Sequence, residues 1–275
     1  MLQNWMSWAK RDPSGYRHLE VADSSQNVRE LQEATKSELA DLLLSIRFVP
    51  GFLEDMARDM GWGKVADLMK SLMPTHNSGK RGEFGEAISH AILQEFHGLV
   101  VPVVKHQFKI TRGQSLPGID IIALKVGSGP QIDEVCYVEC KLRTKRDDSA
   151  ATGGFEQLKN EYTTKLPAML TFVAQRLYER SDALFEPFKL YLSDRSDNIG
   201  KDKFVLSLCW EKNEWDEAVL TNLDEKIEVD GEGPNTVLAV VIQLQSLVSL
   251  TDEVFTMSIT TIFDPPLTTY FDPPG

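Results

Sequence analysis

The sequence predicts an α/β fold in which a mixed central sheet is flanked by helices and a helical annex comes first. Two observations carry this prediction. Apolar residues recur at helical spacing in the first 75 residues, whereas the middle of the chain combines helices with strand-like runs rich in Val and Ile. The order helix, three strands, helix, strand is typical of an α/β core. We therefore divide the chain into a helical annex, 1–75, and an α/β domain, 76–275, that includes an acidic C-terminal extension.

The annex is expected to hold three helices. Apolar residues recur at helical spacing within 28–47, and Pro50 with Gly51 breaks this run. Two shorter helices are expected at 52–60 and 64–73, because glycines separate them.

The α/β domain is expected to open with a helix at 81–96. Strands follow where Val and Ile are frequent, and a second long helix is expected to be interrupted near Pro167. The expected strands are 100–110, 119–126, 135–142, 188–192, 204–210, 237–245 and 254–262, and the second helix is 154–180. The Pro-rich run 263–275 is expected to be an extended tail.

Composition fits a globular protein with a buried core, because 42% of the 275 residues are hydrophobic and 25% are charged. Three cysteines make neither a disulfide framework nor a zinc site, which favours a reducing, cytoplasmic setting. The start of the chain lacks the pattern of a signal peptide, and the apolar run 237–242 is too short to span a bilayer. We therefore expect no association with a membrane.

Charge is distributed unevenly along the chain. The net charge is -12, and residues 166–275 hold 8 Lys and Arg against 19 Asp and Glu. Residues 76–165 hold 12 basic and 11 acidic residues. Since phosphate binding depends on Lys and Arg displacing counterions, such a chain should bind DNA weakly on its own.

The residues that suggest chemistry are Glu139 and Lys141, on the run VCYVECKLR. Residues two apart in a strand point to the same face, so this carboxylate and this ammonium lie side by side. Asp120 opens the preceding strand, and glycines between the two strands predict a hairpin. A turn near Gly129 would place Asp120 opposite Glu139 or Cys140, with Cβ atoms roughly 5 Å apart.

Two carboxylates at such a distance repel each other unless a cation lies between them. Carboxylate oxygens suit Mg²⁺, and Mn²⁺ is an alternative cation. A metal held by Asp120 and Glu139 could polarise a phosphodiester and activate water, while Lys141 orients the water or stabilises negative charge. The basic residues that follow, Arg143, Lys145 and Arg146, could hold neighbouring phosphates or form a solvated loop.

Two acidic residues on the helix before the strands, Glu83 and Glu86, lie three positions apart and share a face. Either could complete the acidic site, or both could be surface residues that complement the helix dipole. Gln157 and Lys159, on the helix after the strands, could also face the site. The histidines His90, His97 and His106 show no ligand pattern and are interpreted as structural or surface residues.

Taken in order, Glu86, the run Pro117-Gly118-Ile119-Asp120 and the run Glu139-Cys140-Lys141 resemble the motifs of the PD-(D/E)xK nuclease superfamily. The motifs span about 79–165. The resemblance implies a restriction-endonuclease-like core in which Asp120, Glu139 and Glu86 are metal ligands and Lys141 is the catalytic lysine. Glu83 is the competing helical acid. The superfamily's Pro-Asp is here Pro-Gly-Ile-Asp, which leaves the role of the aspartate unchanged.

A closer resemblance is to the HamA family, the nuclease subunit of Hachiman anti-phage defence systems. The RGEFGE helix, the PGID and VECK strands, the acidic C-terminal part and the length carry it. This resemblance implies a magnesium-dependent deoxyribonuclease, acting on DNA with a HamB-like helicase as its protein partner.

Other motif classes are not met. The run at Gly79-Lys80 lacks the pattern of a P-loop, and Gly127-Ser128-Gly129 is not followed by a helix, so no nucleotide or other small-molecule cofactor is expected. Two alternatives to a nuclease stay open: a non-catalytic adaptor that keeps the nuclease fold and binds a DNA-processing partner, and an enzyme with a different metal chemistry.

Overall fold

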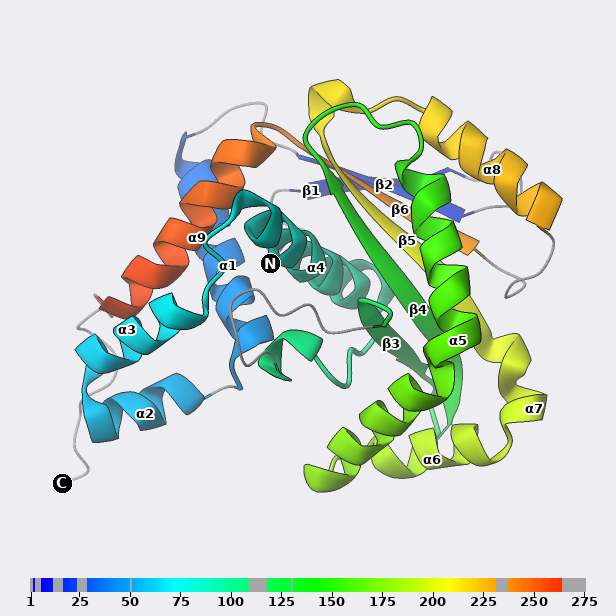
Figure 1. The fold of residues 1–275 in the computed structure, drawn as a ribbon, viewed down its shortest axis with the longest axis horizontal. Coiled ribbons are helices and arrows are strands. Elements are labelled where there is room, and N and C mark those ends of the chain that lie inside the picture. The colour runs from blue at the N-terminus through cyan, green and yellow to red at the C-terminus, as the bar shows by residue number, and fades with distance from the viewer. Residues whose placement is uncertain are drawn as a thin grey trace.

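A six-stranded mixed sheet forms the centre of the computed structural model (Figure 1). The structure describes residues 2, 6–11, 17–23, 29–49, 51–108, 118–129, 131–230 and 237–263. Across the sheet the strands are β1 (Met6–Arg11), β2 (Arg17–Asp23), β6 (Val237–Leu244), β5 (Asp202–Glu211), β4 (Ile132–Arg143) and β3 (Ile121–Val126). The four central strands are parallel, whereas the outer pairs β1–β2 and β3–β4 are antiparallel.

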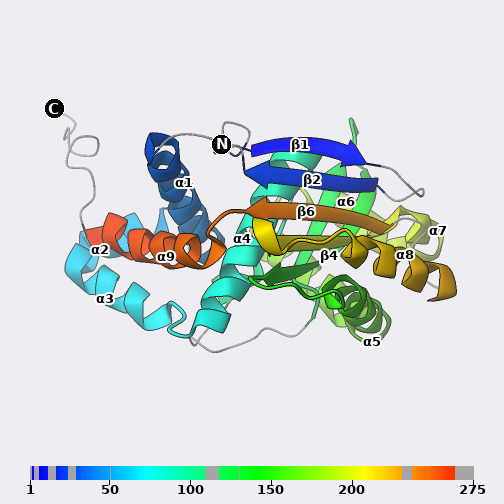
Figure 2. The ribbon, with the colours of Figure 1, turned by 90° about the horizontal axis from the view of Figure 1, so that it is seen from above.

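Helices cover both faces of this sheet (Figures 1 and 2). They are α1 (Arg29–Arg47), α2 (Phe52–Met60), α3 (Trp62–Leu72), α4 (Asn77–His97), α5 (Ala150–Glu179), α6 (Phe185–Ser193), α7 (Arg195–Asn198), α8 (Ala218–Asp230) and α9 (Leu247–Phe263), with short 3-10 turns η2 (Lys105–Phe108), η3 (Ile199–Lys201) and η4 (Lys212–Glu214). The helices α1, α4 and α9 lie on one face, and α5, α6 and α8 lie on the other.

Successive side chains of β4 pack alternately into the hydrophobic clusters on the two faces of the sheet. Val138 packs with α4, whereas its neighbour Tyr137 packs with α5. Successive side chains of a strand point to opposite faces, so strands covered on both sides read as almost continuous apolar runs. Helices α2 and α3 form a smaller cluster around Val65 and Met69, which Phe48 joins from the end of α1.

The predicted α/β class, with a mixed sheet between helices, is confirmed. The helices expected at 28–47 and 52–60 are α1 and α2, and the strands expected at 204–210 and 237–245 are β5 and β6. The hairpin expected from Asp120 to Lys141 is the pair β3–β4.

Two predicted strands are wrong, because both segments are helical. The residues 188–192 lie in α6, and 254–262 lie in α9. In α6 the buried Phe188 and Tyr191 are three positions apart, which is helical spacing. Short apolar runs cannot be assigned by periodicity alone, and here packing against the sheet selects the helix.

The strand expected at 100–110 is also wrong over its described part. It makes a single bridge, Val100 to Leu124, and then turns into η2, while residues 109 and 110 lie outside the described residues. Helix α5 continues through Pro167, so the expected interruption is absent. The residues 264–275 of the expected tail are likewise outside the described part.

The first 75 residues are not helical throughout. Strands β1 and β2 join the central sheet, with β2 pairing beside β6, so the helices of the annex begin at Arg29. Strand β1 pairs with its neighbour β2, and β2 joins the sheet by pairing with β6, which is far away in the sequence. No local pattern predicts that distant pairing. Helix α9 packs against α1 and α3, so the last described helix adjoins the annex. No helix of the described residues is long and apolar enough to cross a membrane.

Candidate active site

The acidic residues singled out by the sequence meet at the end of the β3–β4 hairpin. Ile121 pairs with Val138, so Asp120, which precedes β3, falls opposite Glu139 in this register. Gly118 has φ +100°, a conformation that favours glycine, and this lets the chain turn into β3. Pro117, the first residue of the predicted motif, lies outside the described residues.

Asp120 lies directly before β3, at the end of the β3–β4 hairpin. Its Oδ2 accepts a hydrogen bond from the main-chain N–H of Cys140, at 2.9 Å. Loss of hydration, and then the charges of Glu86 and Glu139, raise the pKa of the Asp120 carboxyl well above its usual value, against the opposing effect of Lys105. The carboxylate therefore lies close to an acid from α4 and to an acid from β4.

The Glu139 side chain is almost completely buried, since the residue is 2% exposed. Its Oε1 accepts a bond of 2.7 Å from the Lys141 ammonium, which also donates to Oε1 of Gln157 at 2.8 Å. Its Oε2 is buried and has no partner among the described residues. Burial raises the pKa of the Glu139 carboxyl, although Lys141 acts in the opposite direction. A cation bound to the bare oxygen would remove this conflict.

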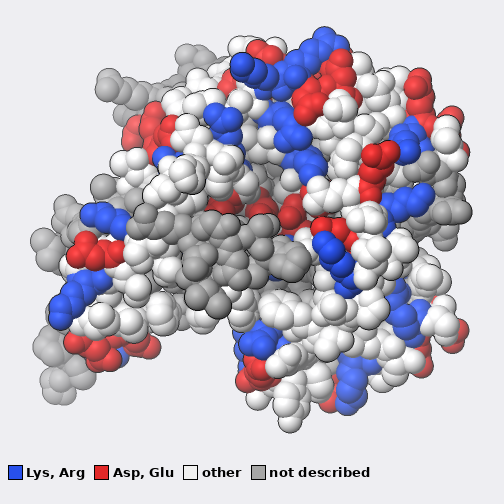
Figure 3. Space-filling view, viewed as in Figure 1, with Lys and Arg blue, Asp and Glu red and all other residues white. Residues whose placement is uncertain are grey.

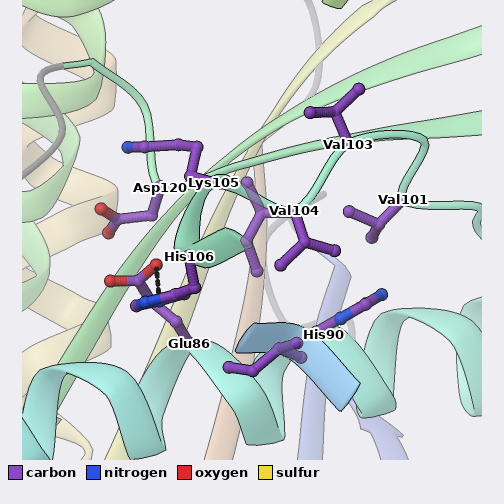
Figure 4. Close-up of a pocket in the computed structure, with 10 residues that line it drawn as sticks. Glu86, His90, Val101, Val103, Val104, Lys105, His106 and Asp120 are labelled. Carbon is purple, nitrogen blue, oxygen red and sulfur yellow. Dashed lines mark hydrogen bonds and ion pairs between the residues drawn. The ribbon is translucent and has the colours of Figure 1, made fainter. Parts of the chain in front are cut away.

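Glu86 faces Asp120 from α4 (Figure 4). Its Oε2 is 2.6 Å from Nε2 of His106, a residue of η2. The neighbouring Lys105 donates to the carbonyls of Gly118 and Ile119, at 3.0 and 2.8 Å, and so holds the segment that leads to Asp120. Sequence reasoning missed the roles of both η2 residues, because no spacing links them to the acidic motifs.

Glu83 has a different environment from Glu86. Both of its oxygens accept bonds from the Arg47 guanidinium, at 2.7 and 2.6 Å, and both side chains are almost completely buried. Arg47 also donates to the carbonyl of Leu72. Glu83 therefore links α4 to α1, whereas Glu86 is the helical acid beside Asp120. The geometry favours Glu86 for the site.

Helix α5 covers the other side of the centre. Gly154 lies against Lys141: a Cβ placed on Gly154 would be 3.3 Å from Cε of Lys141. Gln157, one helical turn further on, accepts a hydrogen bond from the Lys141 ammonium, so it faces the site as the sequence suggested. Lys159 lies two positions beyond Gln157, so it projects from a different side of the helix.

The basic residues after Lys141 are partly engaged by carboxylates. Arg143 pairs with Asp147 at 2.6 Å, and Arg146 pairs with both Asp148 and Asp216, at 2.8 and 2.6 Å. Figure 3 shows acidic side chains inside a hollow near the middle of this face, with Lys and Arg side chains on the surface around it. Phosphates bound at the two arginines would have to compete with these carboxylates.

Whether these residues could bind a divalent metal ion depends mainly on Glu139. Among the described residues, no group of three or more His, Cys, Asp or Glu side chains is arranged to hold a metal ion. Each acid of the centre has at least one oxygen engaged by the protein: by Cys140 N–H for Asp120, by His106 for Glu86 and by Lys141 for Glu139. The buried Oε2 of Glu139, which has no partner among the described residues, is the atom best suited to bind a cation. The nearby carboxylates of Asp120 and Glu86 would add negative charge around that cation.

The sheet with helices on both faces and an acidic hairpin end defines a PD-(D/E)xK nuclease-like core. A comparison with protein families matches residues 10–257 to the HamA family, and the chain belongs to that family. Membership associates the chain with Hachiman defence. A comparison with curated proteins found no match.

Proposed function

We propose that this chain is a metal-dependent DNA nuclease that hydrolyses phosphodiester bonds as the effector subunit of a Hachiman anti-phage complex. The observation that carries the proposal is the meeting of Asp120, Glu139 and Lys141 at one hairpin end, with a buried Glu139 oxygen left bare. A buried carboxylate oxygen without a partner is costly, by about 1–3 kcal/mol for a neutral group and more for a charged one, so a role outside folding accounts for it best.

The side chains divide the work of hydrolysis between them. Asp120, Glu139 and Glu86 would hold a Mg²⁺ or Mn²⁺ ion, which would polarise the phosphodiester and lower the pKa of water. The Lys141 ammonium, held by Glu139 and Gln157, is placed to orient the attacking water or to stabilise charge on the phosphate. His106 orients Glu86, and Lys105 orients the segment before Asp120.

A helicase partner explains the acidic surface. The net charge of -12 opposes long-range attraction to DNA, so a DNA-binding partner would deliver the substrate. Weak intrinsic affinity for DNA would also protect the cell's own chromosome from the nuclease. The annex helices and the acidic C-terminal part are the docking surfaces in this proposal, because the acidic centre is built from other segments.

The activity is tested by incubating the purified chain, alone and with its co-purifying partner, with plasmid and linear DNA. Cleavage is expected in Mg²⁺ and not in EDTA, and the partner should increase it. A complex that binds DNA and leaves it intact in Mg²⁺ and in Mn²⁺ would favour the alternative, an adaptor with a nuclease fold.

The partner is tested by purification from the native host, followed by size-exclusion chromatography. Co-elution with a helicase is expected. A chain that elutes as a free monomer, and binds duplex DNA tightly at physiological salt without help, would contradict the partnership.

A further inference from the structure

Glu161 is a buried acid of α5 that the motifs do not include. It lies four residues after Gln157 and seven after Gly154, so all three project from one side of the helix. Two of them contact Lys141. Glu161 is 7% exposed, although it lies on the helix that covers the candidate centre.

Neighbours on both elements place Glu161 beside Glu139. On α5 it lies between Gln157, which contacts Lys141, and Tyr162, whose ring packs edge-on against Tyr137 at 5.1 Å. On β4, Glu139 lies between the same two partners, Lys141 and Tyr137, and on the same face of the strand. The two acids therefore occupy matching positions across the α5–β4 contact.

The two carboxylates are also held alike. Oε1 of Glu139 accepts from Lys141 at 2.7 Å, and Oε1 of Glu161 accepts from Lys165 at 3.1 Å. In each case Oε2 is buried and has no hydrogen-bond partner among the described residues. Each lysine thus donates a hydrogen bond to one oxygen, and the other oxygen has no partner among the described residues.

The two carboxylates also interact electrostatically. The charge of Glu161 contributes to raising the pKa of the Glu139 carboxyl, after the larger effects of burial and of Lys141. Two buried carboxylates repel each other, and a divalent cation bound between them would offset this repulsion and coordinate both free oxygens. Mg²⁺ needs only one or two protein carboxylates, because it keeps several of its waters.

We propose that Glu161 is a further ligand of the metal centre, and that the free Oε2 atoms of Glu139 and Glu161 share a divalent cation. This inference rests on the proposed function, since it extends the same centre by one acid. It adds a ligand from the helix that also positions Lys141, so metal binding and the placement of Lys141 depend on the same element.

The test is Mn²⁺ binding to the full chain, measured by electron paramagnetic resonance and by calorimetry, without DNA. Glu161→Gln keeps the shape of the side chain and removes its charge. We expect it to weaken Mn²⁺ binding by at least about tenfold, or to remove one bound ion, and Glu161→Asp should restore part of the affinity. The matched control is Glu156→Gln, because Glu156 is an exposed acid of the same helix that pairs with a lysine, Lys226, at 2.9 Å.

A second measurement separates a ligand from a structural ion pair. In EDTA, the melting temperature of Glu161→Gln should equal or exceed that of wild type, because a buried repulsion is removed. On addition of Mn²⁺ the variant should gain less than wild type. Wild-type Mn²⁺ affinity and stoichiometry in Glu161→Gln, with binding lost in Glu139→Gln, would overturn this inference and leave the proposed function standing. Absence of Mn²⁺ binding to the wild-type chain would instead overturn both.

Discussion

Asp120 and Cys140 are joined by a hydrogen bond of 2.9 Å from the main-chain N–H of Cys140 to the Asp120 carboxylate. Strand β3 begins only at Ile121, so a side chain here takes the place of the next main-chain acceptor along the ladder. The bond holds the carboxylate at the end of the hairpin, close to Glu86 of α4 and Glu139 of β4.

Replacing Glu139 and Lys141 together by alanine should lower the rate of DNA cleavage by at least about 100-fold and leave the chain folded. The double variant is preferred because it removes both members of an ion pair, whereas one substitution would leave a buried charge without its partner. Cleavage is followed on plasmid DNA, and folding by circular dichroism. A folded double variant that degrades DNA at the wild-type rate would show that the catalytic assignment is wrong.

Glu83→Gln and Glu86→Gln should have opposite profiles. Glu83→Gln breaks the buried pair with Arg47 and should cost about 3–5 kcal/mol of unfolding free energy. Glu86→Gln should lower cleavage at least about tenfold, with a smaller loss of stability, because Glu86 adjoins Asp120. Urea denaturation and nuclease assays measure the two effects. Strong loss of activity in a stably folded Glu83→Gln, with none in Glu86→Gln, would reverse the assignment.

Gly153→Ala and Gly154→Ala form a matched pair within α5. A Cβ at Gly153 meets no atom within 4 Å, so alanine should stabilise the helix by up to about 1 kcal/mol without changing cleavage. A Cβ at Gly154 would lie 3.3 Å from Cε of Lys141 and should displace that side chain, which lowers the cleavage rate. Melting temperature and rate are compared for both. Equal rates in the two variants would show that the position of Lys141 tolerates this displacement.

His90 should make the chain less stable at mildly acidic pH. Burial, and to a lesser extent His106, lowers the pKa of His90 to about 4, from an ordinary value of 6.5. The unfolded chain then binds a proton that the folded chain does not, so stability is complete above about pH 6.5 and falls as the pH drops toward 4. The loss attributable to this residue is at most about 3 kcal/mol.

The measurement is the unfolding free energy of wild type and His90→Leu between pH 7 and pH 4. The stability of wild type relative to the variant should decline across this window. His76→Leu is the control, since His76 is exposed. A constant difference between wild type and His90→Leu over the whole range would contradict the low pKa.

Local features of the sequence were sufficient for much of the fold. The helix at 52–60 is bounded by glycines at both ends, and the hairpin of β3 and β4 has its turn between two runs rich in Val and Ile. That hairpin predicted Asp120 opposite Glu139 or Cys140, because register in a short antiparallel pair is set by its turn, and the register of the structure selects Glu139. The segments 188–192 and 254–262 failed for the opposite reason, since a short apolar run fits a strand as well as a buried helix.

The sequence by itself determined the α/β class, the hairpin and the pattern of Asp120, Glu139 and Lys141, because these depend on neighbours along the chain. Only the tertiary structure decided that Glu86 lies beside Asp120 while Glu83 pairs with Arg47, and that His106 and Glu161 adjoin the same centre. Those contacts join segments 20 or more residues apart. They exist because α4 and α5 pack on opposite faces of one sheet, and which side chain each helix turns toward the hairpin end depends on packing that no local pattern records.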